Sequence, residues 1–229
     1  MGDGVEMAFN VEEGNKGPGK FMARGLARDQ TRDERISLPR PKYQSQTSIE
    51  QALSRRRSVR DFRDRPLVLS ELSQLLWAGQ GITHRSGYRA APSAGALYPL
   101  DMYVLVGNIT GIDVGTYKYL PQEHILLNFA TGDKRMALRY AALDQPAVSG
   151  AAAVFVFCAV YGRTTEKYGK RGIRYVHMEA GHVAQNVYLQ AVSLQLGTVV
   201  LGAFDDERVK EVLTLREEQP LYLMPVGKT

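Results

Sequence analysis

Residues 151–162 read AAAVFVFCAVYG, an unbroken run of small, β-branched and aromatic residues. No polar residue alternates with the apolar ones, a pattern typical of a strand buried on both faces. We therefore expect this run to be the central strand of a sheet. It contains Cys158, the single cysteine of the chain, which we interpret as a buried apolar residue. One cysteine cannot form an internal disulfide, which fits a reducing compartment and predicts a cytoplasmic protein.

Downstream of this strand, the sequence predicts a long helix from about residue 175 to residue 196. Its apolar residues recur every three or four positions and so share one face of a helix. They are Val176, Ala180, Val183, Val187, Ala191 and Leu194. We expect Gly197 to end this helix, with a strand at 198–203, a short helix at 205–213 and a last strand at 220–227 after it.

Upstream, Ser48 and Gln51 have the spacing of a capping box, which predicts a helix over residues 49–57. We expect Ser70 to cap a second helix, which Gly81 ends. Between this helix and the central strand, the sequence predicts a loop or short helical turn at 91–99, strands at 101–107 and 115–121, and a helix at 132–145. Because strands and helices alternate, the expected class is α+β or α/β with a mixed sheet.

Residues 1–47 are poor in apolar residues and show no sustained period, so we expect an N-terminal arm before a domain at 48–229. The arm is either flexible or extended around a partner subunit, and Pro39 and Pro41 favour extended backbone. The sequence contains no run of about 18 apolar residues, which is the length that a membrane-spanning helix needs. The first residues lack the basic and apolar regions of a signal peptide. We therefore expect no membrane partner.

The chain has 229 residues and a net charge of +5, and its basic residues are spread along the sequence apart from one run at 55–57. A mild positive excess suits an anionic small molecule, and it also suits weak attraction to nucleic acid. RNA-binding modules usually combine basic residues with exposed aromatic ones. The Tyr and Phe residues here lie mostly in apolar strand patterns, so we expect no nucleic-acid partner.

The segment RRRSVRDF, residues 55–62, concentrates groups that can bind phosphate. Arg56, Arg57 and Arg60 surround Ser58. Guanidinium groups present a rigid fork of donors that matches phosphate oxygens, and a hydroxyl can complete the set. The alternative is a solvated basic face at a helix end, where cations also suit the helix dipole.

Two glycine-containing segments suit the close approach of a flat ring. APSAGALYP, residues 91–99, holds a run of small residues that lets backbone approach a ring closely. VVLGAFDD, residues 199–206, passes from a strand through Gly202 and Ala203 to a helix, and backbone amides at such a junction can donate to a ring nitrogen or carbonyl. The alternative for each is an ordinary turn.

The segment 167–186, KYGKRGIRYVHMEAGHVAQN, carries many polar groups ahead of the long apolar stripe. Lys167 and Tyr168 are candidate acid–base groups, and the alternative for Lys167 is a solvated surface lysine. His177, Glu179 and His182 superficially suggest a metal site. Their spacing is not the i, i+4 histidine pair of zinc proteases, so we expect no metal. No G-x-G-x-x-G, P-loop or G-x-S-x-G motif occurs in the chain.

Taken in order, these segments resemble the nitroreductase family, and most closely its SagB/ThcOx-type dehydrogenase branch. The resemblance runs from about Ser48 to Gly227. It rests on RRSVRDF, LSELSQLLWAGQGIT, APSAGALYPLDMYVL, KYGKRGIRYVHMEAGHVAQN, LGAFDD and YLMPVG. It implies an α+β nitroreductase-like fold, in which helices flank a central, mixed and mainly antiparallel sheet. It also implies an intertwined homodimer with FMN at the subunit interface.

The resemblance also implies roles for particular residues. Those expected to hold the phosphate and ribityl end of FMN are Arg56, Arg57, Ser58 and Arg60, with Lys228 as a further candidate. Those expected to line the flavin from the other subunit are Pro92, Ser93, Ala94 and Gly95. Gly202 and Ala203 would lie beside the ring near N5, and Lys167 and Tyr168 match a catalytic Lys-Tyr pair. Gly202 stands where many nitroreductases have Glu.

The activity implied is hydride exchange between flavin N5 and a small organic substrate, by a ping-pong mechanism like that of a SagB-type dehydrogenase. One alternative is an NAD(P)H-dependent reductase of nitroaromatics or quinones. A second is a flavin-binding protein without turnover. NAD(P)H or another electron donor or acceptor is therefore a candidate partner.

Overall fold

The computed structural model describes residues 35–229, so the first 34 residues of the arm predicted for residues 1–47 lie outside the described part. Seven strands form one sheet in the order β1-β6-β5-β3-β7-β9-β8, and all neighbouring strands in it are antiparallel. A separate parallel pair joins β2 to β4. The strands are β1 (Arg35–Ser37), β2 (Leu67–Val68), β3 (Leu100–Val106), β4 (Ile109–Thr110), β5 (Gly115–Leu120), β6 (Ile125–Thr131), β7 (Ala153–Ala159), β8 (Leu196–Thr198) and β9 (Gln219–Lys228).

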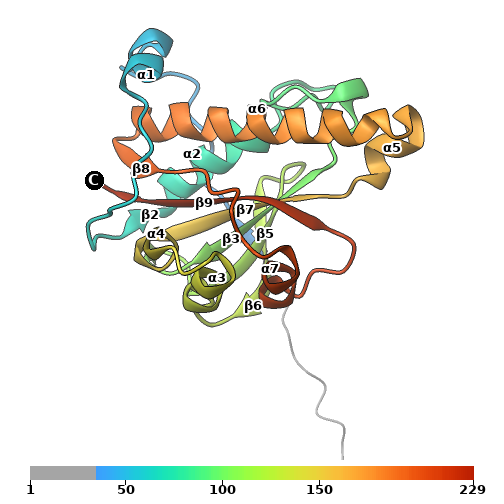
Figure 1. The fold of residues 1–229 in the computed structure, drawn as a ribbon. Coiled ribbons are helices and arrows are strands. Elements are labelled where there is room, and N and C mark those ends of the chain that lie inside the picture. Colours follow the sequence, from blue (N-terminus) through green and yellow to red (C-terminus); the bar gives the residue numbers. More distant parts are fainter. Residues whose placement is uncertain (1–34) are drawn as a thin grey trace, which may run out of the picture. The chain divides into compact units, whose positions relative to one another are not determined.

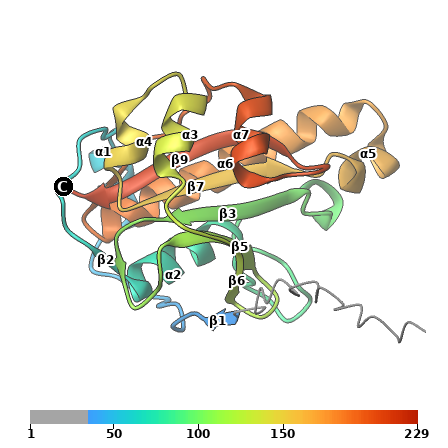
Figure 2. The ribbon, with the colours of Figure 1, turned by 90° about the horizontal axis from the view of Figure 1, so that it is seen from below.

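Helices cover both faces of this sheet, which confirms the α+β class. Figure 1 shows α2 and α6 above the sheet and α3, α4 and α7 below it. Figure 2 shows the molecule from below, with α3, α4 and α7 in front of the sheet. The helices are α1 (Ile49–Arg55), α2 (Leu69–Gln80), α3 (Arg135–Ala141), α4 (Pro146–Gly150), α5 (Gly162–Tyr168), α6 (Arg171–Ser193) and α7 (Asp206–Leu213). No helix among residues 35–229 has both the length and the apolar character that crossing a bilayer requires.

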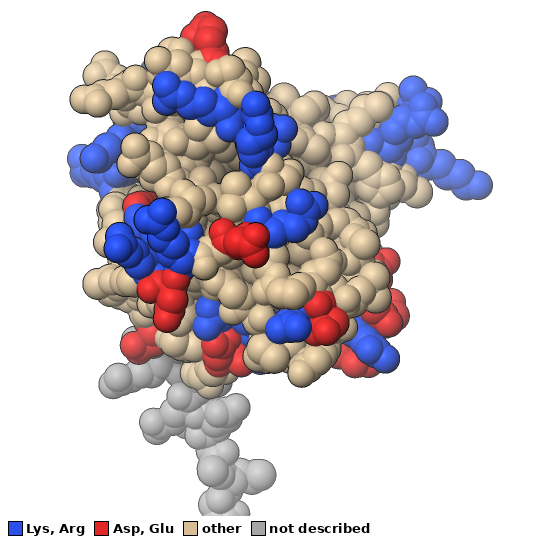
Figure 3. Space-filling model, turned by 60° about the vertical axis from the view of Figure 1, so that its left-hand side comes forward, with Lys and Arg blue, Asp and Glu red and all other residues tan. Residues whose placement is uncertain are grey.

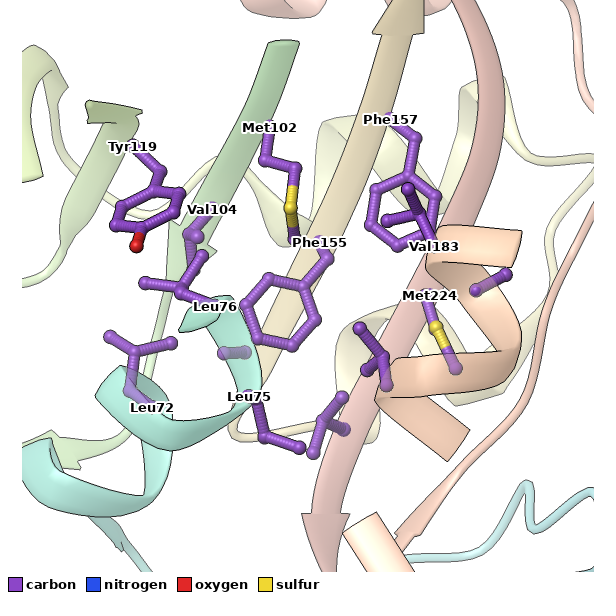
Figure 4. Close-up of a cluster of buried hydrophobic side chains, with 14 of the residues drawn as sticks. Leu72, Leu75, Leu76, Met102, Val104, Tyr119, Phe155, Phe157, Val183 and Met224 are labelled. Atoms are coloured by element: carbon purple, nitrogen blue, oxygen red, sulfur yellow. The ribbon is translucent and has the colours of Figure 1, made fainter. Parts of the chain in front are cut away.

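Strand β7 is central and buried along its whole length, as its sequence predicts. It lies between β3 and β9, and Phe155 is paired with Val104 on one side and Met224 on the other. Alternate residues of a strand point to opposite faces, so β7 contributes to two apolar cores. Phe155 and Phe157 pack with α2 and α6, as Figure 4 shows. Cys158 faces the other core, against α3, α4 and α7.

Helix α6 is the long helix that the apolar stripe predicts, but its limits differ from the expected 175–196. It begins at Arg171 and ends at Ser193, and β8 already begins at Leu196. Gly197 lies inside β8 and does not end the helix. The chain reverses at Gln195, which has a φ of 57°. The apolar pattern alone could not place this end because it continues from the helix into the strand.

Helices α1 and α2 test the caps that the sequence predicts. Ser48 and Gln51 form the expected capping box at α1. The prediction that Ser70 caps α2 is wrong, because α2 begins at Leu69 after Val68. The amide of Val68 donates to Oε2 of Glu71, at 3.0 Å, and this contact replaces the serine cap. Gly81 follows the last residue of α2, as expected.

Several elements have no counterpart among the sequence predictions. Strand β6 and helix α5 are absent from them. The helix expected at 132–145 is the shorter α3, which ends before two residues with positive φ, Leu143 and Asp144, and α4 follows outside the predicted range. Within the predicted arm, β1 pairs with β6. The main chain of Lys42 exchanges two hydrogen bonds with the side chain of Gln74 on α2. Residues 35–42 are therefore attached to the sheet and to α2.

Candidate functional site

The basic segment after α1 is joined to the end of α6 by one tyrosine. Oη of Tyr188 lies 3.0 Å from Oγ of Ser58, and the Arg56 guanidinium carbon lies 5.2 Å from the centre of the Tyr188 ring. The same hydroxyl accepts a hydrogen bond from the amide of Val200, at 2.8 Å. Tyr188 therefore brings the phosphate-binding candidates to the chain that leads into Gly202.

The rest of this segment runs along the edge formed by β8 and β9. The amide of Val59 donates to the carbonyl of Thr198, at 2.9 Å. A Cβ atom on Gly227 would lie 2.8 Å from Cβ of Phe62, and one on Gly197 would lie 2.8 Å from the Val59 side chain. The two glycines thus allow an approach that any side chain would prevent. This edge holds Arg57, Ser58 and Arg60 exposed to solvent.

Gly202 and Ala203 are exposed and follow Leu201, whose main chain exchanges two hydrogen bonds with Leu223 of β9. No hydrogen bond within residues 35–229 uses the amide of Gly202 or of Ala203. Two backbone donors thus stand free shortly after Val200, which Tyr188 connects to the basic segment. This arrangement could donate to the ring of a bound ligand, as the sequence suggested.

Lys228 is the cofactor-binding candidate whose charge is already paired. Its Nζ lies 2.5 Å from Oε1 of Glu71 on α2, and the lysine side chain is 28% exposed. A phosphate would have to share the ammonium group with this carboxylate. The role of Lys228 in cofactor binding stays a prediction.

The small-residue segment forms a tight turn, η1 (Ala94–Ala96), in an unusual backbone conformation. Gly95, Ala96 and Tyr98 all have φ between 48° and 63°, a region that residues with a Cβ atom rarely adopt. The amide of Tyr98 donates to Oγ of Ser93, at 2.9 Å, which closes the turn. Gly95 and Pro92 are exposed, so the turn presents backbone to its surroundings.

Lys167 and Tyr168, at the end of α5, meet this turn at Gly95. A Cβ atom on Gly95 would lie 2.8 Å from Oη of Tyr168 and 3.1 Å from Nζ of Lys167. The Tyr168 ring is held edge-on by Tyr175, with ring centres 5.2 Å apart. The structure therefore brings together both candidate acid–base residues and one of the predicted flavin-lining segments.

These residues form two separate groups in one chain. The basic segment contacts Tyr188 near the end of α6, whereas the Lys167–Tyr168 pair contacts Tyr175 near its start. These tyrosines are 13 positions apart on the helix, which corresponds to about 20 Å at 1.5 Å per residue. Figure 1 shows α1 and α5 over opposite ends of α6. One chain therefore does not bring all the predicted site residues together.

Glu179 is a functional candidate that the sequence indicated only as a doubtful metal ligand. Its side chain is buried, whereas His177 and His182 are exposed. Among residues 35–229, no three His, Cys, Asp or Glu side chains gather as metal ligands. Burial raises the pKa of the Glu179 carboxyl, while hydrogen bonding from Ser93 and Gln80 and the charge of Arg89 oppose the rise. Its place beside Val176, Ala180 and Val183 on the helical stripe was the signal for burial.

Residues 53–228 match the family model described as "Nitroreductase family". The chain belongs to the nitroreductase family. It is 49% identical over 180 residues to "Putative nitroreductase MJ1384" of Methanocaldococcus jannaschii, an alignment that covers 79% of this chain and 90% of the relative. A crystal structure of a Ralstonia eutropha JMP134 protein with a similar description has a TM-score of 0.76 and 32% identity, over 85% of this chain and 89% of that one.

A third relative supports the SagB-type branch within the nitroreductase family. The microcin B17-processing protein McbC of Escherichia coli is 30% identical over 146 residues. The alignment covers 61% of this chain and 54% of McbC, so the present chain matches about half of that relative. Membership of the family makes this chain an oxidoreductase with a nitroreductase-like fold.

Proposed function

We propose that this nitroreductase is an FMN-dependent oxidoreductase that acts on a small organic substrate by a ping-pong mechanism, most like a SagB-type dehydrogenase. The observation that carries the proposal is the convergence of Lys167 and Tyr168 on Gly95. A proton donor and acceptor pair beside exposed, side-chain-free backbone suits chemistry on a substrate lying over a flat ring.

The donors of the chain fit FMN. Arg56, Arg57, Ser58 and Arg60 offer charged and hydroxyl donors for a phosphate and a ribityl chain, and the free amides of Gly202 and Ala203 suit a ring edge. The small residues Pro92–Gly95 leave room for a planar face. FMN, when bound, would supply the acceptor and donor of hydride at N5.

The chain itself would handle the proton. Oη of Tyr168 and Nζ of Lys167 are the groups placed to give or take a proton at the substrate, and Tyr175 holds the Tyr168 ring in position. General acid–base groups of this kind contribute about 10²- to 10⁴-fold to rate. Tyr168→Phe should therefore lower turnover by about 10²-fold and leave FMN content unchanged. Full turnover in Tyr168→Phe and Lys167→Ala would remove their proposed role.

A homodimer would complete the site. The basic segment and the Gly95 turn are separated by most of α6, so we propose that each pocket combines the first from one subunit with the second from its partner. Exposed residues of α6 support a contact surface, because Met178 is 51% exposed, Ile173 is 43% exposed and Gly181 has open space beside it. Contiguous exposed apolar patches often mark subunit contacts.

Mixed dimers test this arrangement. Chains carrying Arg56→Ala and chains carrying Tyr168→Phe would each form homodimers of low activity. If the pocket combines two subunits, a mixed dimer has one pocket with both changes and one with neither, so activity returns. If each pocket belongs to one chain, every pocket of the mixed dimer carries one change and activity stays low.

A reductase of nitroaromatics or quinones, driven by NADH or NADPH, is the second candidate function, and the relatives named as nitroreductases favour it. A protein that binds flavin without turnover is the third. The purified protein should be yellow and retain FMN, and a colourless protein that takes up no FMN would remove all three. Rapid anaerobic bleaching by NADH or NADPH would favour the reductase, and its absence the dehydrogenase.

One face of the molecule bears on the prediction that nucleic acid is not a partner. Figure 3 shows the Lys and Arg side chains of one face in separate groups, with Asp and Glu among several of them. A continuous basic surface is the usual mark of nucleic-acid binding. We keep the prediction of a cytoplasmic protein that acts on small molecules.

A further inference from the structure

Glu179 lies on α6, which packs against the turn η1, and its carboxyl group is buried. Its side chain is 2% exposed, and its Oε1 atom forms no hydrogen bond within residues 35–229. Burying a carboxyl group in this way costs free energy unless its neighbours compensate for the lost water. The neighbours that do so come from the end of α2 and from the segment between α2 and β3.

Ser93 is one of these neighbours. Its Oγ already accepts a hydrogen bond from the amide of Tyr98, which leaves the hydroxyl proton free to be donated. Burial raises the pKa of the Glu179 carboxyl group, and hydrogen bonding from Ser93 opposes this rise, as expected for a donor to a carboxylate. Ser93, which begins the turn, therefore links Glu179 to Tyr98, which ends it.

Arg89 is the second link. It is the charged group that faces Glu179, and it is itself flanked by Asp101 and Arg163. Its guanidinium carbon lies 4.5 Å from the centre of the Tyr98 ring, and its amide donates to Oη of Tyr98, at 3.1 Å. Arg89 thus holds Tyr98 by both its main chain and its side chain.

The turn itself needs such support. Ala96 and Tyr98 carry Cβ atoms yet have φ of 54° and 48°, so their backbone costs free energy that surrounding contacts must offset. The turn also meets Oη of Tyr168 and Nζ of Lys167 at Gly95. Ser93 and Arg89 therefore connect Glu179 with a turn that contacts the two groups that we propose to move protons.

We infer that Glu179 is a positioning residue, which acts through Ser93 and Arg89 to fix the Gly95–Tyr98 turn and thereby sets the place of the turn relative to Lys167 and Tyr168. This inference rests on the proposed function. In the proposed reaction, Glu179 touches no reacting atom. A shift of the turn would misplace the substrate against its proton donor, and misplacements of about 1 Å can cost about 10²-fold in rate.

The test compares three variants of the FMN-loaded protein. Glu179→Leu removes the acceptor, Glu179→Gln keeps an acceptor oxygen for Ser93, and Val187→Ala is a control that disturbs another buried position of α6. We expect Glu179→Leu to lower kcat by about ten-fold or more with FMN still bound, and Glu179→Gln to recover part of the loss. Equal rates in the Leu and Gln variants, or equal losses in Glu179→Leu and Val187→Ala, would overturn the inference.

A double-mutant cycle tests the route through Ser93. If Glu179 acts through Ser93, the loss in Glu179→Leu combined with Ser93→Ala should be no larger than the larger single loss. If the two losses multiply, the residues act independently and the inference is wrong.

A readout without flavin separates this inference from the proposed function. In the FMN-free protein, the amide chemical shifts of Gly95 and Ala96 should move in Glu179→Leu and stay in place in Val187→Ala. Failure of the wild-type protein to bind FMN would overturn the proposed function alone, because these shifts would still decide the inference. Unchanged shifts at Gly95 and Ala96 in Glu179→Leu would overturn the inference alone.

Discussion

The hydroxyl of Tyr188 lies 3.0 Å from the hydroxyl of Ser58, although 130 positions separate the two residues in the chain. The contact joins the long helix α6 to the segment that carries the basic cofactor-binding candidates. The same tyrosine oxygen accepts the amide of Val200, so one side chain connects three segments.

Replacing Tyr188 by Phe should therefore weaken FMN binding. The change leaves the Val200 amide without its acceptor, at a cost of about 1–3 kcal/mol, and frees Ser58 from its contact. We expect the Kd for FMN to rise about ten-fold, as measured by flavin fluorescence titration. Tyr140→Phe is the matched control, because Tyr140 is 60% exposed. An unchanged Kd in Tyr188→Phe would contradict this prediction.

Gly95→Ala should lower turnover strongly and the free energy of unfolding only slightly. Gly95 has a φ of 63°, and its new methyl group would strike Oη of Tyr168. Gly87 has a φ of 84°, and a Cβ atom there would meet nothing within 4 Å, so Gly87→Ala carries the backbone cost without the collision. Each change should cost about 1 kcal/mol in the free energy of unfolding. We expect only Gly95→Ala to lower kcat, by about ten-fold or more, and equal activity in both variants would refute the prediction.

Stability should fall as the pH drops below about 6.5, the ordinary pKa of histidine. Burial lowers the pKa of His124, so the folded protein keeps this ring neutral while the unfolded chain takes up a proton. Nδ1 lies 2.8 Å from Oη of Tyr119, and Nε2 lies 2.8 Å from Oγ of Ser73. Urea unfolding at pH 7.5 and 5.5 should show the loss.

His124→Gln should reduce this pH dependence, whereas the control His182→Gln should leave it in place, because His182 is exposed. If the free energy of unfolding falls equally with pH in His124→Gln and in the wild-type protein, the effect belongs to other groups.

Gly227→Ala should destabilise the protein by about 1–3 kcal/mol, the usual cost of forcing extra atoms into a packed region. Its Cβ atom would lie 2.8 Å from Phe62, whereas a Cβ atom on Gly202 would meet the Tyr222 ring at an ordinary 3.5 Å. Gly202→Ala is therefore the stability control. Because Phe62 belongs to the basic segment, Gly227→Ala should also weaken FMN binding. Equal unfolding midpoints in the two variants would show that Phe62 moves aside freely.

The elements that the sequence predicted are those with a strong local pattern. Strand β7 needed only an unbroken apolar run, and α1 needed only Ser48 and Gln51 at the right spacing. The start of α2 was misplaced because Glu71, and not Ser70, satisfies the first amide. The end of α6 was misplaced because apolar residues continue into β8.

The sequence predicted the segments of the candidate site separately. It did not predict the contacts between these segments. Lys167 and Gly95 are 72 positions apart, and no periodicity relates such residues. Glu179 looked like one of several polar groups near a helix start until the fold placed Ser93 and Arg89 against it. Lys228 was predicted only as a further phosphate-binding candidate, and its ion pair with Glu71 of α2 became visible only in the fold.

The elements that depend on neighbours along the chain could be predicted from the residues alone, as could the motifs whose order resembles the nitroreductases. Helical and strand periods, caps and small-residue turns act over a few residues, so they can be recognised locally. The contacts between these segments were known only from the three-dimensional fold. It placed the Lys167–Tyr168 pair on the Gly95 turn and the basic segment on Tyr188, at opposite ends of α6. Such contacts arise from the packing of helices on the sheet, which no local pattern specifies.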